Sequence, residues 1–64
     1  MKTVYSVFVD GTEVNDSYLD KESAEMLGYD YLHDNYDEVI IVKFEKTESG
    51  MYKLVDDYIL EFIK

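Results

Sequence analysis

The feature that most constrains the fold is a pair of strand-like segments, residues 3–9 and 39–44, that carry apolar side chains on both faces. Successive side chains of a strand point to opposite faces, so Phe8 points one way while Val7 and Val9 point the other. β-branched and aromatic residues dominate both segments, which favours strands. A single helix covers only one face of a sheet, and the second apolar face therefore requires another cover.

The chain between these two segments predicts a hairpin followed by a helix. Asp10-Gly11 is a strong signal for a two-residue hairpin, because glycine tolerates the positive φ of such turns. A second strand is expected over about residues 12–19, with a bulge or bend at its polar Asn-Asp-Ser triplet. Asp20 suits a helix N-cap, and the predicted helix ends near Asn35.

The predicted helix has an apolar inner face and an acidic outer face. Gly28 weakens a helix by about 1 kcal/mol relative to alanine, so we expect it to allow close approach to a sheet. Met26 and Tyr29 are expected to be exposed on the outer face among carboxylates. The inner face is predicted to consist of Ala24, Leu27, Gly28, Tyr31 and Leu32.

The C-terminal third predicts a fourth strand over residues 51–55 and an ambiguous tail. Residues 54–63 show both a helical apolar repeat and strand composition. We favour a strand with a break at Asp56-Asp57, with a short helix as the alternative. The chain is thus predicted to be one acidic α+β domain over residues 1–64, a ββαββ antiparallel sheet with one helix packed on one face.

There are two alternatives for what covers the second apolar face of this predicted sheet. Homodimerisation is favoured, because small domains often need a partner to bury enough apolar surface. The alternative is that the C-terminal segment folds over that face.

The second constraint is charge: the sequence has fifteen carboxylates, six lysines and no arginine, for a net charge of −9. Residues 1–38 have net charge −8 and residues 39–64 only −1. The electrostatic field of such a negative charge repels nucleic acid and attracts a basic partner or a cation. The carboxylates expected to bind a partner are Asp10, Glu13, Asp16, Asp20, Glu22, Glu25, Asp30, Asp34, Asp37 and Glu38.

The spacing of these carboxylates resembles the spacing of phosphates. Asp30 and Asp34 are four residues apart on the predicted helix, which places their side chains about 6 Å from each other. Side chains two residues apart on a strand are about 7 Å apart on one face. Phosphates along a DNA strand are separated by similar distances, so a basic DNA-binding groove would accept this array and release counterions as it does on DNA.

Other functional classes find little support. His33 is the only histidine and there is no cysteine, so we expect no metal site, no cofactor and no enzyme activity. The segment after Asp10 lacks the glycine position and the final glutamate of a calcium loop. No apolar run spans a membrane and no signal peptide begins the sequence, so we expect a cytoplasmic protein.

As a whole, this small, arginine-free, cysteine-free, acidic α+β chain with tyrosine-rich strands resembles the DNA-mimic proteins that bacteriophages make against host DNA-binding proteins. Within that group it is most similar to a phage inhibitor of the bacterial nucleoid protein HU. The resemblance rests on size, charge and element order over the full length, and on no short motif. It implies an acidic homodimer that occupies the DNA-binding surface of HU through the carboxylates from Asp10 to Glu38, in the host cytoplasm.

The leading hypothesis is therefore a protein inhibitor that competes with DNA for a basic partner. A second is a small adaptor or assembly subunit that binds by strand addition or through its apolar sheet face. A third is a weak cation-binding module.

Overall fold

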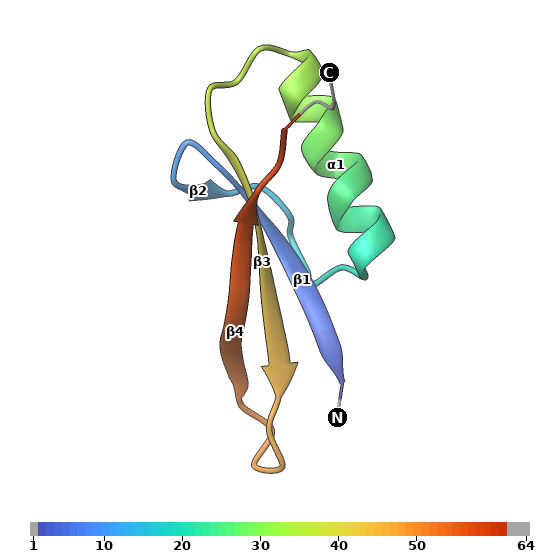
Figure 1. Cartoon of the computed structure of the whole chain (residues 1–64). Helices are drawn as coiled ribbons and strands as arrows, with labels where there is room; N and C mark the ends of the chain where they lie inside the picture. The colour runs from blue at the N-terminus through green and yellow to red at the C-terminus, as the bar shows by residue number, and fades with distance from the viewer. Residues whose placement is uncertain (1, 62–64) are drawn as a thin grey trace.

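The computed structural model describes residues 2–61, which form a four-stranded antiparallel sheet with one helix against one face (Figure 1). The sheet order is β2-β1-β3-β4, which confirms the predicted ββαββ α+β class. No helix in the described part of the chain is long and apolar enough to cross a membrane. The elements, in chain order, are β1 (Thr3–Val9), β2 (Thr12–Glu13), α1 (Lys21–His33), β3 (Val39–Lys46) and β4 (Tyr52–Ile59).

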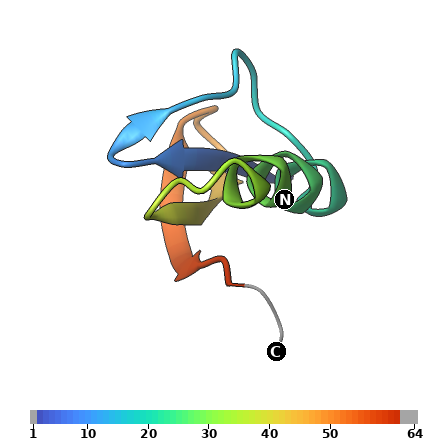
Figure 2. The same ribbon diagram turned by 90° about the horizontal axis from the view of Figure 1, so that it is seen from above.

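The core lies between α1 and the two central strands. Val7 of β1 pairs with Ile41 of β3, and Val9 pairs with Val39, so these four side chains share one face of the sheet. All four are buried, and α1 packs over them along β1 and β3 (Figure 2). The predicted alternation of the two apolar strands is thus confirmed.

Helix α1 begins as the sequence predicts. The side chain of Asp20 accepts a hydrogen bond of 2.7 Å from the Ser23 backbone N–H, which satisfies a donor that the first turn leaves unpaired. The helix ends at His33, two residues before the expected end, and Asn35 then takes a positive φ of 68°. A left-handed residue of this kind commonly ends a helix.

Gly28 brings α1 close to the sheet. A Cβ atom at this position would be 2.6 Å from Leu60 Cδ2, 3.2 Å from Val39 Cγ1 and 3.3 Å from Ile41 Cδ1. The close approach inferred from the sequence is therefore confirmed, since even a methyl group does not fit without movement of its neighbours.

The outer face of α1 differs from the prediction at one residue. Met26 is 64 % exposed, as expected, but Tyr29 is partly buried and packs against the core. The expectation that Tyr29 is exposed was wrong because the core extends beyond the inner face of the helix. Tyr58 of β4 packs against the same core.

The second strand is shorter than predicted, because the polar triplet ends it at Glu13. The Asn15 side chain takes the place of a strand backbone beside β1: its Oδ1 accepts from Val7 N–H at 2.8 Å, and its Nδ2 donates to Ser6 Oγ at 3.3 Å. The chain then returns to pair Leu19 with Tyr5. This arrangement satisfies the fully buried Ser6 hydroxyl.

The C-terminal segment is a strand up to Ile59, which confirms the favoured interpretation; its predicted extension over residues 62–63 lies outside the described residues. The expected break at Asp56-Asp57 is absent, because both residues are paired with β3 inside β4. The irregularity is one residue earlier: Lys43 pairs with Asp56 and Phe44 with Leu54, leaving Val55 as the extra residue of a bulge. Leu60 then enters the core on the α1 side. Up to residue 61, the segment therefore does not cover the face of the sheet opposite α1.

Candidate acidic interaction surface

A reciprocal contact joins two acidic segments that are far apart in the sequence. Asp10 and Gly11 form the tip of the β1–β2 hairpin with φ values of 50° and 87°, as the Asp-Gly signal predicted. The Asp10 N–H donates to the Glu38 carbonyl at 3.0 Å, and the Asp10 carboxylate accepts from the Glu38 N–H at 3.1 Å. The hairpin turn is thereby fixed beside the connection that leads from α1 to β3.

The carboxyl end of α1 leads directly into this connection. Asp34 is the C-cap, and its N–H bonds to the carbonyls of Asp30 and Tyr31 at 3.3 and 3.1 Å. The rings of Tyr31 and Tyr36 are in edge contact, with centroids 5.3 Å apart, so the connection is held against the helix. We name this region the acidic end and define it as Asp10, Asp30, Asp34, Asp37 and Glu38, all of them exposed.

Helix electrostatics do not explain the carboxylates at the end of α1. The carboxyl end of a helix carries partial negative charge, which favours cations and disfavours anions. Asp30 and Asp34 lie there four residues apart, so their charges also repel each other. By contrast, Glu22 lies in the first turn, where a negative charge stabilises the helix.

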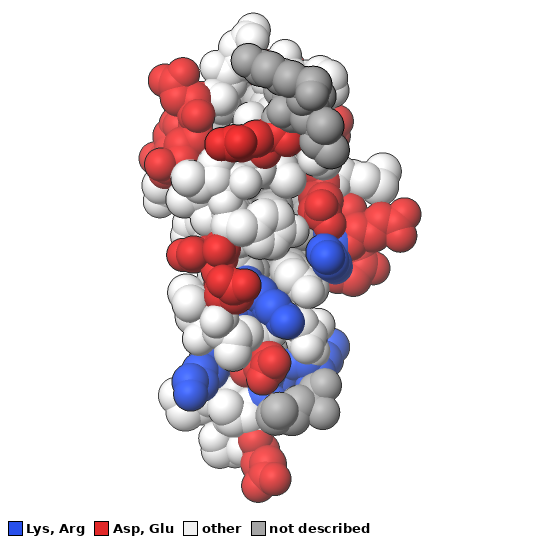
Figure 3. Space-filling view, in the orientation of Figure 1, with Lys and Arg blue, Asp and Glu red and all other residues white. Residues whose placement is uncertain are grey.

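The lysines lie away from the acidic end. No lysine occurs between Lys21 at the start of α1 and Lys43 in β3. Lys46 and Lys2 are neighbours at the far end of the sheet, where the Lys46 N–H donates to the Lys2 carbonyl at 2.9 Å. In Figure 3 the blue side chains lie over the lower half of the molecule and beside the start of α1, and the upper part shows red without blue.

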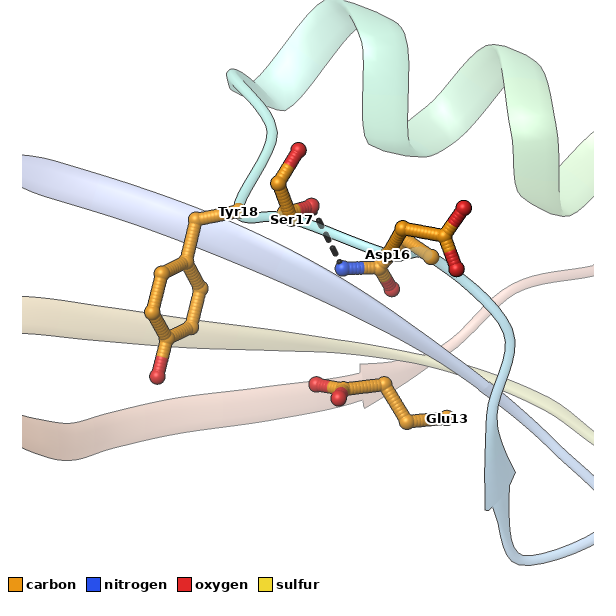
Figure 4. A pocket seen from close by; sticks show the side chains of 5 residues that line it. Glu13, Asp16, Ser17 and Tyr18 are labelled. Atoms are coloured by element: carbon orange, nitrogen blue, oxygen red, sulfur yellow. Dashed lines mark hydrogen bonds between the residues drawn. The ribbon is translucent and has the colours of Figure 1, made fainter.

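The five other predicted carboxylates lie outside the acidic end. Hydrogen bonding to the backbone and side chain of Ser23 lowers the pKa of Asp20 below its ordinary value of 3.8, as expected for an N-cap. Glu13 and Asp16 line a shallow hollow of about 270 Å³ beside Tyr18 (Figure 4). Burial raises the pKa of Tyr58 above 10.0, and the negative charge of the partly buried Glu25 raises it further.

Of the ten predicted carboxylates, the structure therefore joins Asp10 to Glu38 directly and places Asp30, Asp34 and Asp37 on the helix end and the connection that lead to this contact. Asp20 and Glu22 lie at the opposite end of α1 and stabilise its first turn. The contact between Asp10 and Glu38 was not predictable from the sequence, because no local pattern links residues that are 28 positions apart.

Among residues 2–61, no three His, Asp or Glu side chains come together as a metal site. Comparison of the chain with protein-family models, with curated proteins and with solved structures finds no match.

Proposed function

We propose that this chain is an acidic inhibitor that binds the DNA-binding surface of a basic host protein, such as the nucleoid protein HU, and excludes DNA from it. The observation that supports the proposal best is the acidic end. Its carboxylates are exposed, come from three segments of the chain and lie apart from the lysines. Segregated like charge destabilises a small protein by self-repulsion, and a binding role accounts for that cost.

The position of the charge fits a mimic of the DNA backbone. Asp30 and Asp34 are one helical turn apart, so their carboxylates are spaced by about 6 Å, a separation similar to that of successive phosphates. The hairpin turn adds Asp10 beside Glu38, which extends the negative surface beyond the helix. A groove lined with lysine and arginine would gain counterion release from this surface much as it does from DNA.

Such an inhibitor acts by occupying the DNA-binding surface of its partner, without catalysis and without a cofactor. In a phage-infected bacterium it would work in the cytoplasm and reach the nucleoid through its partner. The phage setting and the choice of HU come from the resemblance in size, charge and element order.

The test is a gel-shift competition in which the chain displaces DNA from purified HU. Replacing Asp30, Asp34 and Asp37 together by Asn should abolish the displacement, and raising the salt concentration should weaken the wild-type protein steeply. The matched control is Glu45→Gln, Glu48→Gln and Asp56→Asn, which removes the same number of charges from the half of the molecule that contains most lysines.

This control should inhibit nearly as well as the wild type. If the two triple variants lose inhibition equally, net charge alone is responsible and the acidic end is not the binding surface. If the first variant inhibits like the wild type, the assignment is wrong.

One observation favours the second candidate, a small adaptor. The sheet face opposite α1 exposes apolar side chains, including Leu54 and Ile59. Binding through this face would persist at high salt and depend on these residues. Replacing Leu54 by Asp would then abolish partner binding, whereas the acidic-end variant would retain it.

A further inference from the structure

The face of the sheet opposite α1 carries an open apolar groove. Phe8, Ile40, Val42, Phe44 and Leu54 line most of it, in a hollow of about 260 Å³. The pairing of the strands places these side chains on one face, since Phe8 is opposite Ile40 and Phe44 is opposite Leu54. A sheet face of this composition is stable in water when another apolar surface covers it.

Aromatic rings extend this face toward the β3–β4 turn. The Tyr18 ring lies against Phe44 and Tyr52, with centroids 5.6 and 4.4 Å away, and it remains 43 % exposed. Exposed tyrosines around an apolar centre are typical of protein interfaces.

Charges of opposite sign lie at different places along the same face. Toward the hairpin turn Glu13 is opposite Phe8, and Asp57, opposite Val42, lines the groove itself, so both carboxylates belong to the groove side. At the other end Lys46 is opposite Tyr52, and Lys2 is its backbone neighbour. The face is thus largely apolar, with carboxylates at Glu13 and Asp57 and lysines at the end next to the β3–β4 turn.

The outer edge of β4 is a poorer docking site than this face. The bulge at Val55 interrupts the regular spacing of its backbone groups. The Asp56 side chain also accepts a hydrogen bond of 2.8 Å from the Asp57 N–H, which removes a donor that an added strand would use. Bulges and charged residues on an edge strand oppose the addition of further strands.

We infer that the groove face binds the same face of a second copy of this chain, in a two-fold symmetric dimer with the sheets face to face and their strands antiparallel. In a two-fold interface the same patch meets itself, so the face must complement itself. A parallel arrangement would place lysines on lysines and carboxylates on carboxylates. An antiparallel arrangement centred on the Phe44–Leu54 pair places Lys46 of each copy near Asp57 of the other and lays the apolar side chains of the two faces against each other.

The first experiment is sedimentation equilibrium of the full chain over a range of concentrations. The wild type should reach twice the chain mass of 7.6 kDa. Leu54→Asp should be monomeric, because it places two carboxylates in the apolar centre of the dimer. Leu54 is 53 % exposed in the single chain, so this change should leave the fold intact, as circular dichroism would verify.

The matched control is Met26→Asp on the outer face of α1, where the side chain is 64 % exposed. This variant should dimerise like the wild type. A monomeric wild type at all concentrations, or equal loss of dimer in the two variants, would overturn the inference.

The second experiment tests the antiparallel orientation by reversing charges. Lys46→Glu or Asp57→Lys alone should weaken dimerisation roughly tenfold, because each contact occurs twice in the dimer. The double variant should recover most of this loss, since the carboxylate introduced by Lys46→Glu in one copy then meets the ammonium group introduced by Asp57→Lys in the other. A double variant weaker than either single one would exclude the antiparallel orientation.

Edge-to-edge pairing of β4 would give a different result. In the register centred between Leu54 and Val55, it would bring Lys53 of each copy beside Asp56 of the other, and the bulge places these two residues on the same face of the strand. Rescue by Lys53→Glu with Asp56→Lys, and not by the pair at positions 46 and 57, would overturn the face-to-face dimer.

This inference stands apart from the proposed function. The variant that neutralises Asp30, Asp34 and Asp37 should remain dimeric, and the dimer should persist at salt concentrations that release a basic partner. A dimer that forms without inhibiting HU would refute only the proposed function, and inhibition by a protein that is always monomeric would refute only the dimer.

Discussion

At the scale of single residues, the carboxylates of this chain have different physical roles. The Asp20 carboxylate is held by hydrogen bonds from Ser23 at the amino end of α1, which lowers its pKa, whereas Asp30 and Asp34 lie where the helix disfavours negative charge. The first stabilises the fold. The others add charge to the surface without stabilising the helix.

Asp20 should therefore contribute a pH-dependent part of the stability. Its pKa is lower in the folded chain than in the unfolded one, so the stabilisation is present above pH 3.8 and is lost as the pH falls through the folded-state pKa. Asp20→Asn keeps a good N-cap and removes the charge. Thermal melts from about pH 7 to about pH 2.5 should show the wild type more stable than this variant at neutral pH, with the difference shrinking in acid.

The control for this measurement is Asp16→Asn, which removes a charge that lies outside any helix turn. It should not reduce the stability at neutral pH. A difference between the wild type and Asp20→Asn that stays constant with pH would mean that the hydrogen bond, and not the charge, provides the stabilisation.

At the scale of elements, the contact between α1 and the sheet depends on Gly28. Alanine is favoured over glycine in a helix by about 1 kcal/mol, but here its Cβ would lie 2.6 Å from Leu60 Cδ2. We expect Gly28→Ala to lower the free energy of unfolding by about 1–2 kcal/mol, because overpacking outweighs the gain in propensity. Urea denaturation would measure the change.

The same substitution in a Leu60→Ala background is the control. With the Leu60 side chain shortened, the nearest clash is gone, and the added methyl group should cost less or even stabilise the chain. An equal cost in both backgrounds would place the strain against Val39 and Ile41 instead.

Local patterns predicted the elements of this fold well and their contacts poorly. The Asp10-Gly11 turn, the Asp20 cap and the two apolar strands depend on neighbouring residues, and each was found where it was expected. The length of β2 was not predictable, because Asn15 replaces strand backbone with its side chain. Tyr29 was misplaced for a similar reason: the burial of a residue on a helix flank depends on which strand lies beside it.

At the scale of the whole molecule, the charge and the apolar face lie on different parts of one small structure. The acidic end lies at the carboxyl end of α1 and the hairpin turn, while the open groove lies on the sheet face that α1 leaves uncovered. Each copy of a dimer joined through the groove would keep its acidic end exposed. Two copies would then present two acidic ends to a partner, which would strengthen binding to a dimeric basic protein.

The acidic end should lower the stability of the chain. Neutralising Asp30, Asp34 and Asp37 removes the like-charge pair and the conflict with the helix dipole. In low salt we expect this variant to gain about 1 kcal/mol in the free energy of unfolding, a rise in Tm of roughly 4–8 °C. The gain should shrink at about 0.5 M NaCl, where exposed charges are screened.

The variant with Glu45→Gln, Glu48→Gln and Asp56→Asn should not gain stability in this way. Glu45 is opposite Lys53 and Asp56 is opposite Lys43 across β3 and β4, so these two carboxylates are near charges of the other sign. If both variants gain equally, the benefit comes from net charge alone. A gain confined to the acidic end, together with loss of HU inhibition in the same variant, would mean that these carboxylates are kept for binding at the expense of stability.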